Sequence, residues 1–221
     1  MKNQTISRKK LFSVVLLVFV LILLVFSYQT ILMEAGKYLA PEGKGRADVV
    51  ILEGAELIKE KPVKIGMGLL SSGRVSHIVV VVQQNSGNEQ TFGLPDYGLL
   101  LTKHFEGLGL KRDVFRVIKA PTNHPVTLIE AKVVLSTLSK SGAKSAILLA
   151  EGFHTRRSFW TYKKVGKTLG IEIIPHPYFI NYQNENWWQK TRGIQHFLYE
   201  SLKFFYYILR GYIPIKSLLV T

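Results

Sequence analysis

Cysteine is absent from this chain of 221 residues. Its absence excludes disulfide bonds, a cysteine nucleophile and zinc sites built on thiolates, and it is compatible with a location outside the cytoplasm. The six histidines show no spacing typical of a zinc motif, so no metal site is predicted. The sequence also lacks a Walker loop, a G-x-G-x-x-G turn and a G-x-S-x-G nucleophile elbow.

Acidic residues are scarce: 15 Asp and Glu stand against 29 Lys and Arg, a formal net charge of +14. Nucleic acid is one polyanion that such a charge attracts. The basic residues, however, are spread along the chain, and no nucleic-acid-binding motif gathers them. Anionic lipid headgroups and phosphorylated envelope polymers are an alternative, and a plainly solvated basic surface is another. We predict membrane lipids as partners and no nucleic acid.

One long apolar run is present near the N-terminus. The basic tail 1–10 ends in Arg-Lys-Lys and precedes Leu11–Phe26, in which Ser13 is the single polar residue. Extension to Tyr28 gives a length close to the minimum for a helix that crosses a bilayer, so we predict a transmembrane anchor at 11–28. The preceding cations should stay inside, which places the rest of the chain outside the cytoplasmic membrane. The alternative is a cleavable signal peptide, but its apolar region is shorter and ends at a small-x-small site.

The rest of the chain alternates between short apolar runs and longer amphipathic segments. A stalk at 29–46, an α/β domain at 47–212 and a tail at 213–221 are predicted. Strands are expected at 48–52, 77–82, 114–118, 145–150 and 171–174, and helices at 59–72, 97–107, 125–140 and 155–169. Such alternation is typical of parallel βαβ units. The predicted fold is a Rossmann-like open, mainly parallel sheet with helices on both faces.

The segment 187–212 is rich in aromatic residues and carries Glu200, Lys203 and Arg210. These charges are too many for a confident second membrane span. A helix packed on the domain is one interpretation, and a helix at the membrane interface is the other.

Candidate site residues follow two of the predicted strands, where ligands bind in open parallel sheets. Glu53 and Gly54 follow the first strand. The turn after the fourth strand carries a carboxylate, an imidazole and two guanidinium groups: Glu151, His154, Arg156 and Arg157. Adjacent guanidinium groups at a helix start predict an anion site. An imidazole next to a carboxylate is suited to proton transfer.

Plain structural interpretations of these residues stay open. An Arg pair at a helix start is commonly solvated or salt-bridged. Glu130 follows Thr127 at the spacing of a capping box, so it either caps its helix or belongs to the site. If a common site exists, Glu53, His154 and Arg157 should surround one pocket, with Glu130 on its edge.

Three segments resemble the YdcF/SanA/ElyC-like family, bacterial proteins built on a widespread domain of unknown function. They are 47–54, 127–131 and 154–158, and 200–203 before the aromatic stretch resembles the family's last helix. The resemblance spans about residues 46–212 and implies a Rossmann-like fold. In SanA- and ElyC-type members it also implies a membrane anchor and a role in envelope integrity or peptidoglycan-precursor metabolism. Gly54 and Glu130 match the family positions and are assigned to ligand binding.

The sequence therefore predicts an extracytoplasmic, membrane-anchored envelope protein that binds or processes a phosphorylated, lipid-linked cell-wall intermediate. Arg156 and Arg157 would hold phosphate, while His154 with Glu53 or Glu151 would supply acid–base chemistry. A non-catalytic envelope scaffold or binding module is the alternative. A nucleotide-binding protein is less expected, because nucleotides are scarce outside the cytoplasm. The sequence names no cofactor and does not decide whether the protein is an enzyme.

Overall fold

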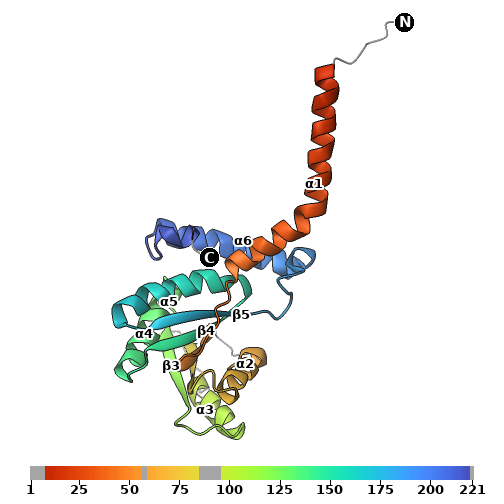
Figure 1. The fold of residues 1–221 in the computed structure, drawn as a ribbon. Helices are drawn as coiled ribbons and strands as arrows, with labels where there is room; N and C mark the ends of the chain where they lie inside the picture. The colour runs from red at the N-terminus through yellow and green to blue at the C-terminus, as the bar shows by residue number, and fades with distance from the viewer. Residues whose placement is uncertain (1–7, 56–58, 85–95, 220–221) are drawn as a thin grey trace, which may run out of the picture.

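A parallel sheet forms the centre of the computed structural model, which describes residues 8–55, 59–84 and 96–219 (Figure 1). Its strands are β1 (Val49–Ala55), β2 (His77–Gln84), β3 (Phe115–Pro121), β4 (Ser145–Glu151) and β5 (Glu172–Tyr178). The strand order is β3-β2-β1-β4-β5, and every neighbouring pair is parallel. This order is the Rossmann order, so the predicted fold class is confirmed.

Helices cover both faces of the sheet because both faces carry apolar side chains. Val79 and Val81 of β2 face α4 (Val126–Lys140) and α5 (Thr155–Leu169). Val80, one residue out of phase, faces α2 (Glu60–Ser71) and α3 (Tyr97–Gly107) on the other side. Burial of each such side chain stabilises the fold by roughly 1.5–3 kcal/mol. The buried Val run is therefore stable only as a central strand between two helical layers.

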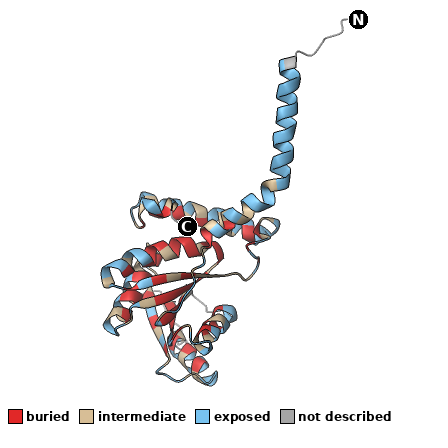
Figure 2. Ribbon diagram, viewed as in Figure 1, coloured by how far each residue is buried: buried red, intermediate tan, exposed pale blue. Residues whose placement is uncertain are grey.

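A long helix, α1 (Arg8–Leu39), leaves the domain and points away from it (Figure 1). Its segment Lys9–Leu39 is long and apolar enough to cross a membrane, with a mean hydropathy of 3.0 over its most apolar window and none of that window buried. Figure 2 shows this exposure along the outer part of the helix. Most of the predicted basic tail 1–10 lies outside the described residues.

The structure differs from the prediction at 29–46, where a stalk was expected. Helix α1 continues without interruption to Leu39. Its last turns pack on the domain, because Leu32 and Leu39 join a cluster with Phe153 and Trp187. Tertiary packing of this apolar face supplies the stability that the local sequence pattern does not reveal. The helix is thus fixed to the domain instead of being joined to it by an irregular linker.

The C-terminal part closes the same end of the domain. Helix α6 (Thr191–Leu209) packs on α5 through Phe204 and Tyr207, which lie against Trp160 and Ile213. It is preceded by the short helix η2 (Trp187–Gln189) and followed by η3 (Ile215–Leu218). Ile213 and Ser217 are buried, so the described part of the predicted tail 213–221 belongs to the domain. One face of α6 packs on the domain, as one interpretation of segment 187–212 expected, and the opposite face is exposed.

Candidate functional site

A pocket of about 1420 Å³ opens at the carboxyl ends of the strands, and we call it the candidate pocket. It lies where the strand order reverses, between β1 and β4, the position at which Rossmann-like sheets bind ligands. Glu53 reaches it from the end of β1, and Glu151 and His154 reach it from the turn after β4. This turn contains the short helix η1 (Gly152–His154), and α6 forms the opposite wall.

His154 is the centre of the polar contacts in this pocket. Its Nε2 lies 2.9 Å from Oε1 of Glu53, and its Nδ1 lies 3.2 Å from Oε2 of Glu200. Nη2 of Arg157 is 2.9 Å from the same Nδ1. A protonated ring therefore donates to both carboxylates, and a ring without a proton on Nδ1 accepts from Arg157. Both protonation states have partners, as a proton-transfer group requires.

The surrounding charges favour the protonated ring. Burial alone would lower the pKa of His154, but Glu53 and Glu200 outweigh burial and the repulsion of Arg157, and raise the pKa to about 9. Burial likewise opposes ionisation of Glu200, yet His154 and Arg157 hold the pKa of that carboxyl well below its usual range. At neutral pH the site therefore holds an imidazolium between carboxylates. A group in this state is suited to act as a general acid.

Arg157 is fully engaged inside this cluster. Its Nε donates to Oε2 of Glu200 at 2.9 Å and its Nη2 to Oε1 at 3.2 Å, a two-pronged ion pair. Its Nη1 donates to Oγ1 of Thr127 at 2.9 Å. The side chains of Arg157 and Glu200 are 6% and 5% exposed. Arg157 lines the pocket, but its geometry is that of a positioning residue for Glu200 and His154.

Arg156 does not line the candidate pocket, contrary to the predicted guanidinium pair. Its Nη1 donates to the backbone carbonyl of Tyr38 at 2.8 Å, and its Nη2 donates to that of Ser217. Its guanidinium also lies 3.6 Å from the centre of the Tyr38 ring. The physical reason is helix geometry, since successive residues of a helix point about 100° apart. Arg156 therefore ties α1 to the C-terminal segment.

Glu130 makes contacts behind the pocket instead of capping α4, whose N-cap residue Pro125 forms no side-chain cap bond. Its Oε1 accepts from the Gly54 N–H at 3.1 Å and from the Tyr162 hydroxyl at 2.8 Å. Its Oε2 accepts from Gln83 at 3.1 Å. Burial, with help from the nearby Glu53, raises the pKa of Glu130 to about 7. The capping alternative is therefore excluded. Glu130, assigned from the sequence to ligand binding at the pocket edge, is not among the lining residues and instead fixes the end of β1.

The sequence left Glu53 and Glu151 as alternative carboxylate partners of His154, and the structure decides between them. Glu53 contacts the ring, and its Oε1 also accepts a hydrogen bond from the Ser158 hydroxyl. Glu151 lines the pocket but pairs with Lys59, 2.7 Å away. The expected meeting of Glu53, His154 and Arg157 around one pocket is observed, with Glu130 just behind the pocket wall.

Glu200 is the main site residue that the sequence did not assign. The signal for it is its place on α6: it lies on the buried face with Gly193, Phe204 and Tyr207. A carboxylate on the apolar face of an amphipathic helix needs a buried cation as partner, because an unpaired buried charge is very costly. That argument predicts a cationic partner, although it does not predict which one.

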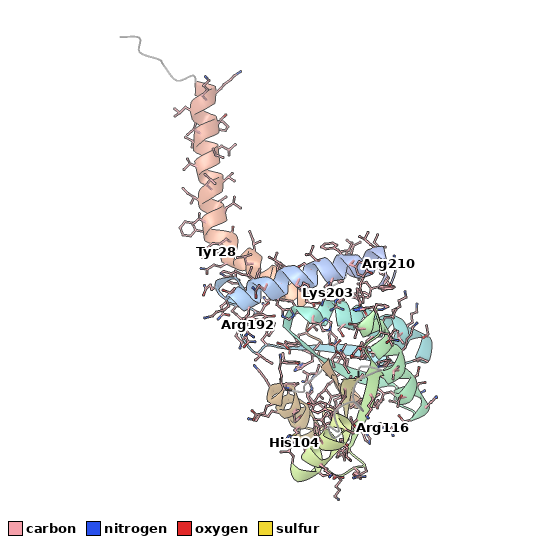
Figure 3. All side chains as sticks on the ribbon, turned by 180° about the vertical axis from the view of Figure 1, so that it is seen from behind. Tyr28, His104, Arg116, Arg192, Lys203 and Arg210 are labelled. Carbon is pink, nitrogen blue, oxygen red and sulfur yellow. The ribbon has the colours of Figure 1, made fainter. Side chains whose placement is uncertain are left out.

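Among the residues that the structure describes, cations outnumber carboxylates along the pocket wall. Three described carboxylates line it, from Glu53, Glu151 and Glu200, against five described basic side chains: Lys59, Arg157, Arg192, Lys203 and Arg210. Figure 3 shows the last three of these spaced along α6. Leu198 and Leu202 add apolar surface to the same wall. This combination favours a ligand that is both anionic and partly apolar. Among the described residues, no group of three His, Asp or Glu side chains is placed to hold a metal.

The fold and the site together define a Rossmann-like α/β domain with an acid–base cluster at its switch point. The domain is carried by an apolar helix long enough to span a membrane. Comparisons of the chain with protein-family models, curated proteins and solved structures found no match. The resemblance to the YdcF/SanA/ElyC-like family stays a prediction.

Proposed function

We propose that this protein is a single-pass protein of the cytoplasmic membrane, with its α/β domain on the outer side. There it binds or processes a phosphorylated, lipid-linked cell-wall intermediate. The orientation is supported by the basic residues that precede the apolar part of α1. The lipid linkage is supported by the anchor itself, which holds the pocket close to the membrane and so raises the effective concentration of membrane-bound ligands.

The observation that carries the proposal is the position of His154, 2.9 Å from Glu53 and 3.2 Å from Glu200, in a pocket whose described wall carries more basic than acidic side chains. The cations on α6 attract the phosphate of the ligand. In hydrolysis of the ester, water attacks the phosphorus and passes a proton to the solvent, while the bond from phosphorus to the ester oxygen breaks. An imidazolium next to that phosphate can protonate the departing oxygen. Glu53, in contact with Nε2, orients the ring and stabilises its charge. The acid–base roles expected of His154 and Glu53 thus remain, and Glu151 becomes a rim residue.

The phosphate contacts differ from those expected from the sequence. Arg156 lies outside the pocket, and Arg157 already pairs with Glu200. We therefore assign phosphate binding to the rim cations Lys203 and Arg210, which are about 10 Å apart along the helix axis. Lys203 lies 3.4 Å from Glu200, but its side chain is 38% exposed and can reach a ligand. Arg192 is about 27 Å from Arg210 along the helix, too far to share the same phosphate. Lys203 and Arg210 both line the pocket. Figure 3 shows them on the half of α6 farther from Arg192.

Calorimetry with the full chain in detergent micelles and a polyprenyl phosphate tests this assignment. Each lost charge-assisted hydrogen bond is worth roughly 1.5–3 kcal/mol, so Arg210→Ala or Lys203→Ala should weaken binding about ten- to hundredfold. Arg116→Ala removes an exposed guanidinium on β3, away from the pocket, and should leave the affinity unchanged. Equal affinities for all three variants and the parent would remove the case for phosphate recognition.

A non-catalytic binding module is the second candidate. The observation that favours it is the internal pairing of the cluster, because Glu200 and Arg157 satisfy each other and are almost wholly buried. His154→Gln separates the two candidates. For an enzyme, the variant binds the ligand and loses turnover, since acid–base groups act mainly in the transition state. For a binding module, the parent itself shows no product while binding is retained.

Topology is tested independently of the ligand. A phosphatase reporter fused after Thr221 should be active, because the fusion point lies outside the cytoplasm. A reporter that needs the cytoplasm should be silent at the same point. The opposite pattern would contradict the orientation and the envelope role with it.

A further inference from the structure

An apolar stripe runs along α6 on the side turned away from the core. The five side chains that form it are between 40% and 85% exposed: Ile194, Leu198, Leu202, Phe205 and Leu209. Their spacing of three and four residues places them on one helix face. The buried face, with Glu200 and Phe204, lies opposite. A stripe of this size along a 19-residue helix is a surface that water solvates poorly, and it indicates a partner.

The position of α1 identifies the partner. Nε1 of Trp187 donates to the carbonyl of Leu32 at 3.0 Å, and the rings of Tyr38 and Phe204 are in edge contact, with centroids 6.3 Å apart. These contacts fix the foot of α1 to α6 and to the turn before it. In Figures 1 and 3, α6 crosses at the end of the domain from which α1 leaves, and Figure 1 shows α3 at the far end. A membrane that takes up Leu11–Phe26 therefore lies next to α6.

The flank of the stripe is suited to a membrane surface. Arg192, Lys203 and Arg210 lie along one side of the helix, where they can meet anionic lipid headgroups. Tyr199 and Tyr206 lie on the same side and are 60% and 50% exposed. Aromatic side chains with a polar tip are enriched at membrane interfaces. An apolar stripe with a basic, aromatic flank is the pattern of a helix that lies in the interface.

The stripe and the candidate pocket share residues. Leu198 and Leu202 belong to the stripe, and both also line the pocket, together with Tyr199, Tyr206 and Lys203. We infer that α6 lies in the headgroup layer of the membrane that α1 spans, and that the pocket opens onto this layer. The pocket then takes an anionic amphiphile from the lipid surface and not from bulk water. This inference rests on the membrane anchor of the proposed function.

A second copy of the chain is the competing partner for the stripe. The bilayer is favoured because the foot of α1 is held against α6 and because the flank of the stripe is basic. Two copies facing each other across the stripe would bring their own rows of Arg and Lys together, which is electrostatically unfavourable.

Single-cysteine labelling tests the inference cleanly, because the chain has no cysteine of its own. The full chain carries Leu209→Cys or Leu202→Cys with an environment-sensitive fluorophore. It is reconstituted into phosphatidylcholine–phosphatidylglycerol liposomes that contain nitroxide-labelled lipid. Leu108→Cys, an exposed leucine just after α3, is the matched control. Val18→Cys reports on the span.

We expect the labels at 202 and 209 to shift to shorter emission wavelengths and to lose most of their intensity to the nitroxide, as the label at 18 does. The label at 108 should show neither change. A label at 209 that stays in water while the label at 18 is quenched overturns the inference and leaves the anchor intact. An unquenched label at 18 overturns both the inference about α6 and the membrane anchor. Protection of the label at 209 that depends on protein concentration in detergent, without lipid quenching, assigns the stripe to a second copy.

Discussion

Raising the pH should destabilise the domain by removing the proton that His154 holds between Glu53 and Glu200. The neighbouring carboxylates raise the pKa of His154 from an ordinary 6.5 to about 9. A pKa difference of one unit between the folded and unfolded states is worth about 1.4 kcal/mol, so the charged ring contributes about 3 kcal/mol. The side chain is 20% exposed, so solvent screens only a minor part of this energy.

The stability falls as the pH rises because the pKa of His154 is higher in the folded state than in the unfolded state. The contribution of His154 is fully present below pH 6.5 and is lost as the pH rises through 9. Glu130 acts in the same direction at lower pH, because burial raises its pKa from 4.5 to about 7 and its charged form is disfavoured in the fold. The two effects have to be separated, and comparison of the parent with His154→Gln does so.

Urea unfolding of the full chain in micelles, followed by tryptophan fluorescence, measures the difference. Trp160 and Trp187 are buried in the domain and report on its unfolding. Below pH 6.5, His154→Gln should be less stable than the parent by about 3 kcal/mol, and the gap should close as the pH approaches and passes 9. A gap that stays constant over this range would refute the view that the ring is held as a cation.

Three further substitutions test separate parts of the structure. Arg156→Lys keeps the charge but loses the planar fork that reaches the Tyr38 carbonyl, so thermal unfolding should show a loss of about 1.5–3 kcal/mol with ligand affinity unchanged. Gly54→Ala places a methyl group against the Glu130 carboxylate and should cost about 1–3 kcal/mol in the same assay. Glu200→Gln leaves buried cations without their counter-charge and should cost about 3–5 kcal/mol, the largest loss of the three.

The fold was predictable because its signals are local. The run of Val residues in β2 and the alternation of strands and helices identify a parallel sheet without knowledge of any tertiary contact. The strand-end rule then placed Glu53 and His154 in the same region, although 101 positions separate them in the chain. In a parallel sheet all carboxyl ends lie at one edge, so residues distant in sequence meet there.

The side-chain directions were not predictable in the same way. Arg156 and Arg157 are equivalent in the sequence, and their different roles depend on which face of α5 meets α1 and which meets α6. Likewise, Thr127 and Glu130 have the spacing of a capping box, but both side chains accept hydrogen bonds from tertiary partners instead. Glu130 accepts from the Gly54 N–H, and Thr127 accepts from Arg157. These outcomes are tertiary and leave no local pattern.

Glu200 connects the candidate site to the orientation of α6 in the membrane. A buried cluster of Arg157, His154 and Glu200 is rarely the most stable solution, since apolar side chains of similar size often stabilise a core as well or better. What such a cluster supplies is a unique arrangement: one rotation of α6 about its axis pairs Glu200 with both cations. A shift of the helix by one residue would turn Glu200 by about 100° and leave it unpaired. The rotation that pairs Glu200 also turns the stripe with Leu202 outward, so the acid–base cluster and the exposed apolar face are fixed by the same contacts.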